Sequence, residues 1–310
     1  MRRSASRPYR GPWPAGATAA RSAACLALLA ATGCATLRGQ HDNAEAVGAC
    51  RQLSREGVAA LEHGDSARAR MLLDQAVEAN GSDVDARRQL AEVLWQSGAS
   101  QEALIHIERA VQLDPRHAAT IVRSGEMHLG LQATDRALAR ADEALVLDGS
   151  LAGAWALRGR VYRTQGQYER ALADFHQALR YNPHSADVLL ETAEVQYKLG
   201  RPQRCLTTLQ NLLRSYPPGE QPRRALWLEG LAYSAVNRPQ EAVAALAAAN
   251  ARGGPEPELL FQLARAQNAA GQTTEATATA RQAADAGHEG SRTLLAQLQA
   301  DALGGGTILR

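Results

Sequence analysis

Side chains able to do chemistry are few and scattered along the 310-residue chain. Lys198 is the only lysine and it follows Tyr197, so there is no Gly-Lys pair to cradle a phosphate and no second lysine for a Schiff base or a Ser-Lys dyad. Carboxylates are plentiful, but an acid/base pair needs two carboxyl groups in unlike environments, and no sequence feature indicates one. We therefore expect neither an enzyme nor a bound cofactor.

The histidines and cysteines form no pattern that holds a metal ion. There is no HExxH, no CxxC and no Cys/His cluster. His128 is expected to be a packed imidazole rather than a base. The histidines, which share no ligand spacing, are His41, His63, His106, His117, His128, His176, His184 and His288.

The amino-terminal segment predicts export. Residues 1–33 contain five arginines and no acid, and residues 23–31 form an apolar run that is too short to span a bilayer. Ala31-Thr32-Gly33-Cys34 resembles the lipobox of bacterial lipoproteins, in which the cysteine is acylated and becomes the first mature residue. The resemblance implies a signal peptide over residues 1–33, lipid on Cys34 and a tether over residues 34–49. An ordinary signal peptide cut near Ala35, or one retained in the membrane, is the alternative.

Removal of this leader changes the charge balance. The whole chain has 34 basic and 32 acidic residues, and loss of the five leader arginines leaves 29 basic residues and a formal charge near −3. The body of the protein therefore gives no indication of binding nucleic acid or an anionic membrane surface. Cys50 and Cys205 would remain outside the lipid site, far apart in the chain, and we expect both to be free thiols.

A 34-residue period organises the rest of the chain. With Trp155 at position four, the spacing predicts seven repeats and a final helix, with three inserted residues at 220–222. The predicted boundaries are 50–83, 84–117, 118–151, 152–185, 186–219, 223–256, 257–290 and a capping helix over 291–303 opened by Ser291.

Small residues recur at fixed positions of this period. Small side chains let two antiparallel helices approach closely, and larger residues such as Tyr162 and Phe175 flank them. Position eight is occupied by Gly57, Ala91, Gly125, Gly159, Ala193, Gly230 and Ala264. Position twenty is occupied by Ala69, Ala103, Ala137, Ala171, Cys205, Ala242 and Ala276.

Glycine at position fifteen predicts the turn between the two helices, because glycine accepts a positive φ without a Cβ clash. It occurs in five repeats, and Asn237 replaces it in repeat six. Repeat three has Gln132 at this position and Gly130 two residues earlier, so its turn is expected to be shifted.

The pattern around Trp155, Gly159, Tyr162, Ala171 and Pro183 resembles the tetratricopeptide repeat. The resemblance implies an all-α fold, a right-handed superhelical α-solenoid of about seven helix-turn-helix repeats over residues 50–303. Residues 304–310 would form a flexible tail. The weakest joint is expected at Pro217–Pro222, as a long loop or as a hinge.

In this family the inner surface, formed by positions two, five, nine, twelve and thirteen of the first helices, receives a peptide or partner helix. Aromatic residues and arginine are common interface anchors, so Trp95, Arg160, Arg163, Tyr197 and Trp227 are the preferred contacts. The corresponding residues of this chain are Arg88, Glu92, Trp95, Glu126, Arg160, Arg163, Glu194, Tyr197, Lys198, Trp227 and Phe261.

These features favour a membrane-tethered adaptor of the bacterial envelope that binds another envelope protein or peptide, on the outer membrane or the periplasmic face in a Gram-negative cell. Neither nucleic acid nor a small-molecule substrate is expected as a partner. The alternatives are a self-associating element of an assembly such as a pilus or secretion machine, and an enzyme whose site in the groove is not recognisable.

Overall fold

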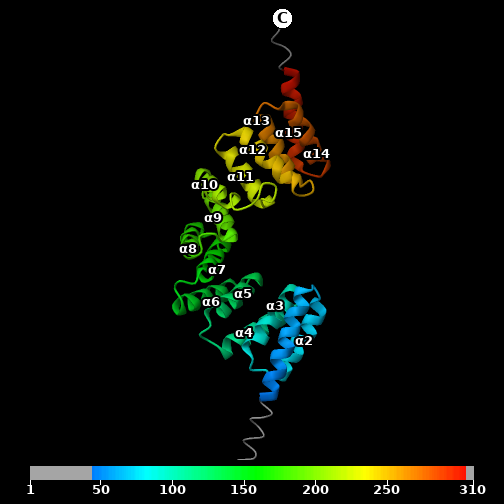
Figure 1. Cartoon of the computed structure of the whole chain (residues 1–310). Helices are drawn as coiled ribbons and strands as arrows, with labels where there is room; N and C mark the ends of the chain where they lie inside the picture. Colours follow the sequence, from blue (N-terminus) through cyan, green and yellow to red (C-terminus); the bar gives the residue numbers. More distant parts are fainter. Residues whose placement is uncertain (1–43, 305–310) are drawn as a thin grey trace, which may run out of the picture. The chain divides into compact units, whose positions relative to one another are not determined.

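The computed structural model describes residues 44–304, and helices are the only regular elements among them (Figure 1). Contacts divide the chain into two units, the first ending at Leu113 and the second beginning at Asp114. The all-α helical-repeat fold predicted by the period is confirmed. None of the described helices combines the length and the hydrophobicity needed to cross a bilayer.

The first unit consists of two helical hairpins. Its first helix covers residues 44–62 and so includes residues 44–49, which the sequence places in the tether. The helices that follow are α2 (Ser66–Ala79), α3 (Val84–Gln96) and α4 (Ser100–Leu113). The expected leader, Cys34 and the tail from residue 305 lie outside the described residues.

The second unit continues the alternation of first and second helices and ends with a single helix. Pro217–Pro222 lies inside this unit, where the Arg252 guanidinium donates to the Gln221 carbonyl (3.1 Å) and to its side-chain oxygen (2.7 Å). Its helices are α5 (Ala118–Gly130), α6 (Thr134–Leu147), α7 (Ala152–Thr164), α8 (Tyr168–Tyr181), α9 (Ala186–Lys198), α10 (Pro202–Leu213), α11 (Arg223–Ala235), α12 (Pro239–Ala251), α13 (Pro257–Ala269), α14 (Thr273–Asp285) and α15 (Glu289–Gly304).

The glycines at position eight lie where the two helices of a hairpin touch. A Cβ placed on Gly159 would come within 2.7 Å of the buried Phe175 ring and 3.3 Å of the Ala171 carbonyl. A Cβ on Gly230 would lie 2.5 Å from Leu246 Cγ. The close approach expected from the small residues is therefore present, and it leaves no room for a methyl group.

The turn of repeat three differs from the expectation. The prediction that this turn is shifted is wrong, because Gln132 itself has a positive φ of 61° and Gly130 is the last residue of α5. The Gln132 and Ala133 amides donate to the Leu129 and His128 carbonyls (both 2.9 Å). The same two bonds close the glycine turns, and they hold glutamine in a conformation that costs an L-residue roughly 1–2 kcal/mol.

The start of the final helix also differs. α15 begins at Glu289, and Ser291 is fully buried within it rather than opening it. The Ser291 amide donates to His288 Nδ1 (3.2 Å), so the imidazole acts as the N-terminal cap. The ring is fixed by stacking on Phe261, with centroids 4.3 Å apart, and by Glu258 at 3.0 Å from Nε2.

Substitution of two glycines in α7 should have opposite effects on stability. Gly159→Ala should lower the free energy of unfolding by about 1–3 kcal/mol, because the methyl group overlaps Phe175. The control Gly153→Ala places its Cβ at an ordinary 3.6 Å from Val122 and should raise it by about 0.5–1 kcal/mol, since alanine favours helix. Equilibrium urea unfolding measures both, and equal midpoints would contradict the assigned hairpin contact.

Replacing the strained glutamine should stabilise the protein. Gln132→Gly removes the cost of a positive φ, and we expect a gain of roughly 0.5–1 kcal/mol in thermal or urea unfolding. Gln165→Gly is the matched control, because Gln165 is the C-cap of α7 with an ordinary φ of −81°, so glycine there should lower stability by adding backbone freedom to the unfolded chain. A loss of stability in both variants would show that Gln132 is not strained.

Candidate functional site

The residues predicted to contact a partner fall into two groups, one in each unit. Arg88, Glu92 and Trp95 lie on α3 in the first unit, where they are half-buried, and Arg88 pairs with Asp85 (3.1 Å). The remaining residues lie on α5, α7, α9, α11 and α13, which together form what we call the first-helix face of the second unit. Direct contacts join α5 to α7, α9 to α11, and α11 to α13.

Alternating charges connect the helices of the first-helix face. Glu191 on α9 accepts from Arg160 Nε through both of its oxygens (3.0 Å each) and lies 3.4 Å from Arg163 Nη2. Its side chain is only 15% exposed, so water screens these pairs weakly. At one end, Glu126 pairs with Arg160 (3.3 Å) and with Arg123 (3.0 Å).

The chain of charges continues to α11. Glu194 accepts from Arg163 (3.2 Å) and forms an ion pair with Arg224, whose Nε lies 2.6 Å away. Four arginines and three glutamates thus form one network, which we call the ladder, with a formal charge of +1. Its members, in spatial order, are Arg123, Glu126, Arg160, Glu191, Arg163, Glu194 and Arg224.

The ladder brings together four predicted residues, Glu126, Arg160, Arg163 and Glu194, and adds three that were not predicted. Arg224 occupies position two of its repeat, a position that the family resemblance already assigns to the inner surface. Arg123 and Glu191 occupy position six, outside that set. Position nine carries an acid, a base and an acid in three successive repeats, at Glu126, Arg160 and Glu194. This alternation of charge every 34 residues could have indicated ion pairs between repeats.

Three adjoining cavities continue from the ladder across α9, α11 and α13, and we call them the groove. A cavity of about 260 Å³ is bordered by Arg163, Glu194, Lys198 and Arg224. The next, about 440 Å³, shares Glu194 and Arg224 with it. That second cavity is otherwise lined by Arg223, Trp227, Leu228, Leu231 and Glu256.

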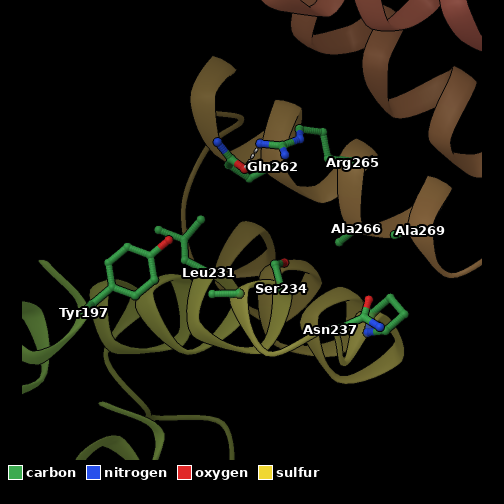
Figure 2. Close-up of a pocket in the computed structure, with 10 residues that line it drawn as sticks. Tyr197, Leu231, Ser234, Asn237, Gln262, Arg265, Ala266 and Ala269 are labelled. Carbon is green, nitrogen blue, oxygen red and sulfur yellow. Dashed lines mark hydrogen bonds between the residues drawn. The ribbon is translucent and has the colours of Figure 1, made fainter. Parts of the chain in front are cut away.

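The third cavity, about 260 Å³, shares Leu231 with the second. Figure 2 shows Tyr197 beside Leu231, with Gln262 and Arg265 opposite them on α13. The Arg265 guanidinium donates to Gln262 Oε1 (3.4 Å) and lies 5.8 Å from the Phe261 ring centroid. The groove therefore combines an apolar centre with charged ends, and it includes the predicted Glu194, Tyr197, Lys198 and Trp227.

A buried thiol, Cys205, and a half-buried carboxyl group, Glu229, lie near Glu194. Burial raises the pKa of the Cys205 thiol to about 12, and the nearby Glu194 and Glu229 carboxylates raise it further. Burial also raises the pKa of the Glu229 carboxyl. Cys50 and Cys205 are both buried free thiols, as expected, and such a thiol is a poor nucleophile. His128 is 4% exposed, which confirms a packed imidazole.

The described part of the chain holds no group of three or more His, Cys, Asp or Glu residues placed to bind a metal ion. What the groove offers is a surface of arginine, lysine, aromatic and aliphatic side chains. Such surfaces bind polypeptide side chains and carboxylates.

Comparison with known proteins identifies the repeats. Residues 54–118 and 162–226 each match a family model described as tetratricopeptide repeat. The chain therefore contains tetratricopeptide repeats, as the 34-residue period predicted.

Two curated relatives match fewer than half of the residues of this chain. One is the U-box domain-containing protein 70 of Oryza sativa subsp. japonica, 26% identical over 136 residues, which are 44% of this chain and 17% of that protein. The other is the TPR repeat-containing protein YpiA of Bacillus subtilis (strain 168), 27% identical over 134 residues, 43% and 31% of the two chains. The chain thus spans less than a third of either relative.

Several solved structures share the fold. The pilF protein of Pseudomonas aeruginosa is similar with a TM-score of 0.61 at 20% identity, over 69% of this chain and 96% of that one. PilW, described as a widely conserved type IV pilus biogenesis factor, is similar with a TM-score of 0.61 at 18% identity, over 68% of this chain and 96% of that one. YrrB, described as a TPR protein with an unusual peptide-binding site, is similar with a TM-score of 0.54 at 22% identity, over 62% of this chain and 97% of that one.

Removal of the central ladder carboxylate should destabilise the second unit. Glu191→Gln leaves Arg160 and Arg163 without their most buried partner, and we expect a loss of about 1–3 kcal/mol in urea unfolding, between the values for exposed and fully buried pairs. Glu169→Gln is the control, because Glu169 is 63% exposed in its pair with Arg201 and should cost at most about 0.5 kcal/mol. Equal effects would mean that the ladder does not stabilise the fold.

Proposed function

We propose that this chain is a protein–protein interaction adaptor of the bacterial cell envelope, which is tethered through lipid on Cys34 and binds a partner segment in the groove of its second unit. The observation that carries the proposal is the groove itself, where Trp227, Leu228 and Leu231 border a cavity that charged side chains surround. A surface of this composition resembles the anchor regions of protein interfaces more than an enclosed small-molecule site.

The neighbours of known structure support an interaction role without choosing the partner. PilW is described as a pilus biogenesis factor and YrrB as a protein with a peptide-binding site. One fold serves many functions, so the partner has to be argued from the groove residues of this chain.

The tether rests on the arginine-rich leader, the apolar run and the Ala31-Thr32-Gly33-Cys34 sequence. Two acyl chains on one cysteine would hold a protein firmly on a membrane, whereas a single chain gives only marginal attachment. Metabolic labelling with an alkyne fatty acid tests this directly. Label and membrane association should both be lost in Cys34→Ser, and a labelled Cys34→Ser variant would exclude lipid at this residue.

The groove is tested by crosslinked pull-down from native envelopes. Trp227→Ala should lose the partner that the parent recovers, because it removes the largest apolar contact of the groove. Trp95→Ala, on α3 of the first unit, is the matched control and should retain the partner. Loss of the partner in Trp95→Ala but not in Trp227→Ala would place the binding site on α3. Unchanged recovery in both variants would exclude both surfaces as the binding site. Recovery of a second copy of the chain alone would favour self-association.

A further inference from the structure

The groove carries a surplus of positive charge. Among the residues that border its three cavities, five are basic (Arg163, Lys198, Arg223, Arg224 and Arg265) and two are acidic (Glu194 and Glu256). The predicted mature chain has more acidic than basic residues, so this surplus is a local feature and not a property of the whole protein.

Pairing inside the protein does not cancel the surplus. Arg163 and Arg224 share Glu194, and Arg223 pairs with Glu256 at 3.3 Å. Among the described side chains, those of residues 44–300, neither Lys198 nor Arg265 has a carboxylate within ion-pair distance, and the Lys198 side chain is exposed. Unpaired cations therefore remain at both ends of the groove.

Between these cations the surface of the central cavity is mostly apolar. Leu228 is buried, Trp227 and Leu231 are half-buried, and all three line the central cavity. An apolar side chain of an occupant would be buried against these residues, while carboxylates on either side of it would pair with the cations at the two ends.

We infer that the groove binds an acidic polypeptide segment, in which aspartate or glutamate flanks a leucine, isoleucine or phenylalanine. The apolar side chain occupies the cavity at Trp227 and Leu231, and the flanking carboxylates face Lys198 on one side and Arg265 on the other. The inference rests on the proposed function, since it names the chemistry of the partner that the same groove would hold. A nucleic acid is disfavoured because the groove centre offers a single aromatic ring, Trp227, beside leucines, and because the predicted mature chain is net acidic.

The first test is selection of random 12-residue peptides, displayed on phage, against the purified full chain. We expect the selected peptides to be enriched in Asp and Glu over the starting library and to contain a large apolar residue. A fluorescein-labelled copy of a selected peptide should bind about five-fold or more weakly when its acids are changed to amides, as expected for the loss of one good charge pair. Raising the salt concentration should weaken binding in the same direction.

The second test reverses one charge of the groove. Lys198→Glu should weaken binding of the labelled peptide about five-fold or more, because the exposed side chain would then repel the acids of the peptide. Thermal unfolding should change little, since no described side chain forms an ion pair with Lys198 and only the small cost of an acid at the C-terminal end of α9 remains. Arg136→Glu on α6 is the control, an equal charge change at an exposed residue that borders none of the three cavities, and it should leave binding unchanged.

The outcomes separate the two ideas. Neutral or basic selected peptides whose binding depends on Trp227 but not on Lys198 would overturn the acidic occupant and leave the adaptor groove intact. If neither Trp227→Ala nor Lys198→Glu weakens any selected peptide, or if no peptide is selected, both the inference and the groove are wrong. Tighter binding of a single-stranded 20-nucleotide DNA than of the peptides would overturn a polypeptide occupant.

Discussion

The constraint on which the structure depends is a small residue, glycine in four repeats and alanine in three, where the two helices of a repeat meet. At Gly57, Gly159 and Gly230 the space that a methyl group would take is filled by a leucine or phenylalanine sixteen residues later. The second helix therefore packs directly against the backbone of the first. Because this contact leaves no free space, the two helices cannot shift relative to each other. The surface on the opposite side of each first helix is therefore fixed as closely as the contact itself.

Packing between repeats compensates where the filling residue is small. In repeat three the residue sixteen positions after Gly125 is Ala141, and Leu157 from the next repeat occupies the space, 2.5 Å from where a Cβ would lie. In repeat seven Ala264 and Ala280 are both small, and Leu294 and Leu298 of α15 pack against them. The final helix thus completes a core that its repeat cannot fill alone, which is the physical role of a terminal cap in repeat proteins.

A feature of the fold could be predicted from the sequence where it recurs from one 34-residue repeat to the next. The glycine turns and the small contact positions recur every 34 residues and were predicted from the sequence, but Gln132 was misjudged because its hydrogen bonds outweigh the preference of one residue. His288 was missed as a cap because its ring is fixed by Glu258 and Phe261, from 30 and 27 residues earlier. The ladder could be predicted only in part: Arg160 pairs over a separation of 31 residues with Glu191 as well as over 34 with Glu126, and the shorter step needs the structure.

The pairings also change what the predicted contact residues can do. Arg160 and Arg163 have the composition of interface anchors, but each is already held by glutamate, so a partner could engage them only by competing with Glu191 or Glu194. Lys198 and Arg265 require no such exchange within the described residues, and they flank the apolar cavity at Trp227 and Leu231. In the ladder, arginines and glutamates of neighbouring first helices pair with one another and so connect these helices. Lys198 and Arg265, which lie outside the ladder, are the charges that give the groove its preference for an acidic segment.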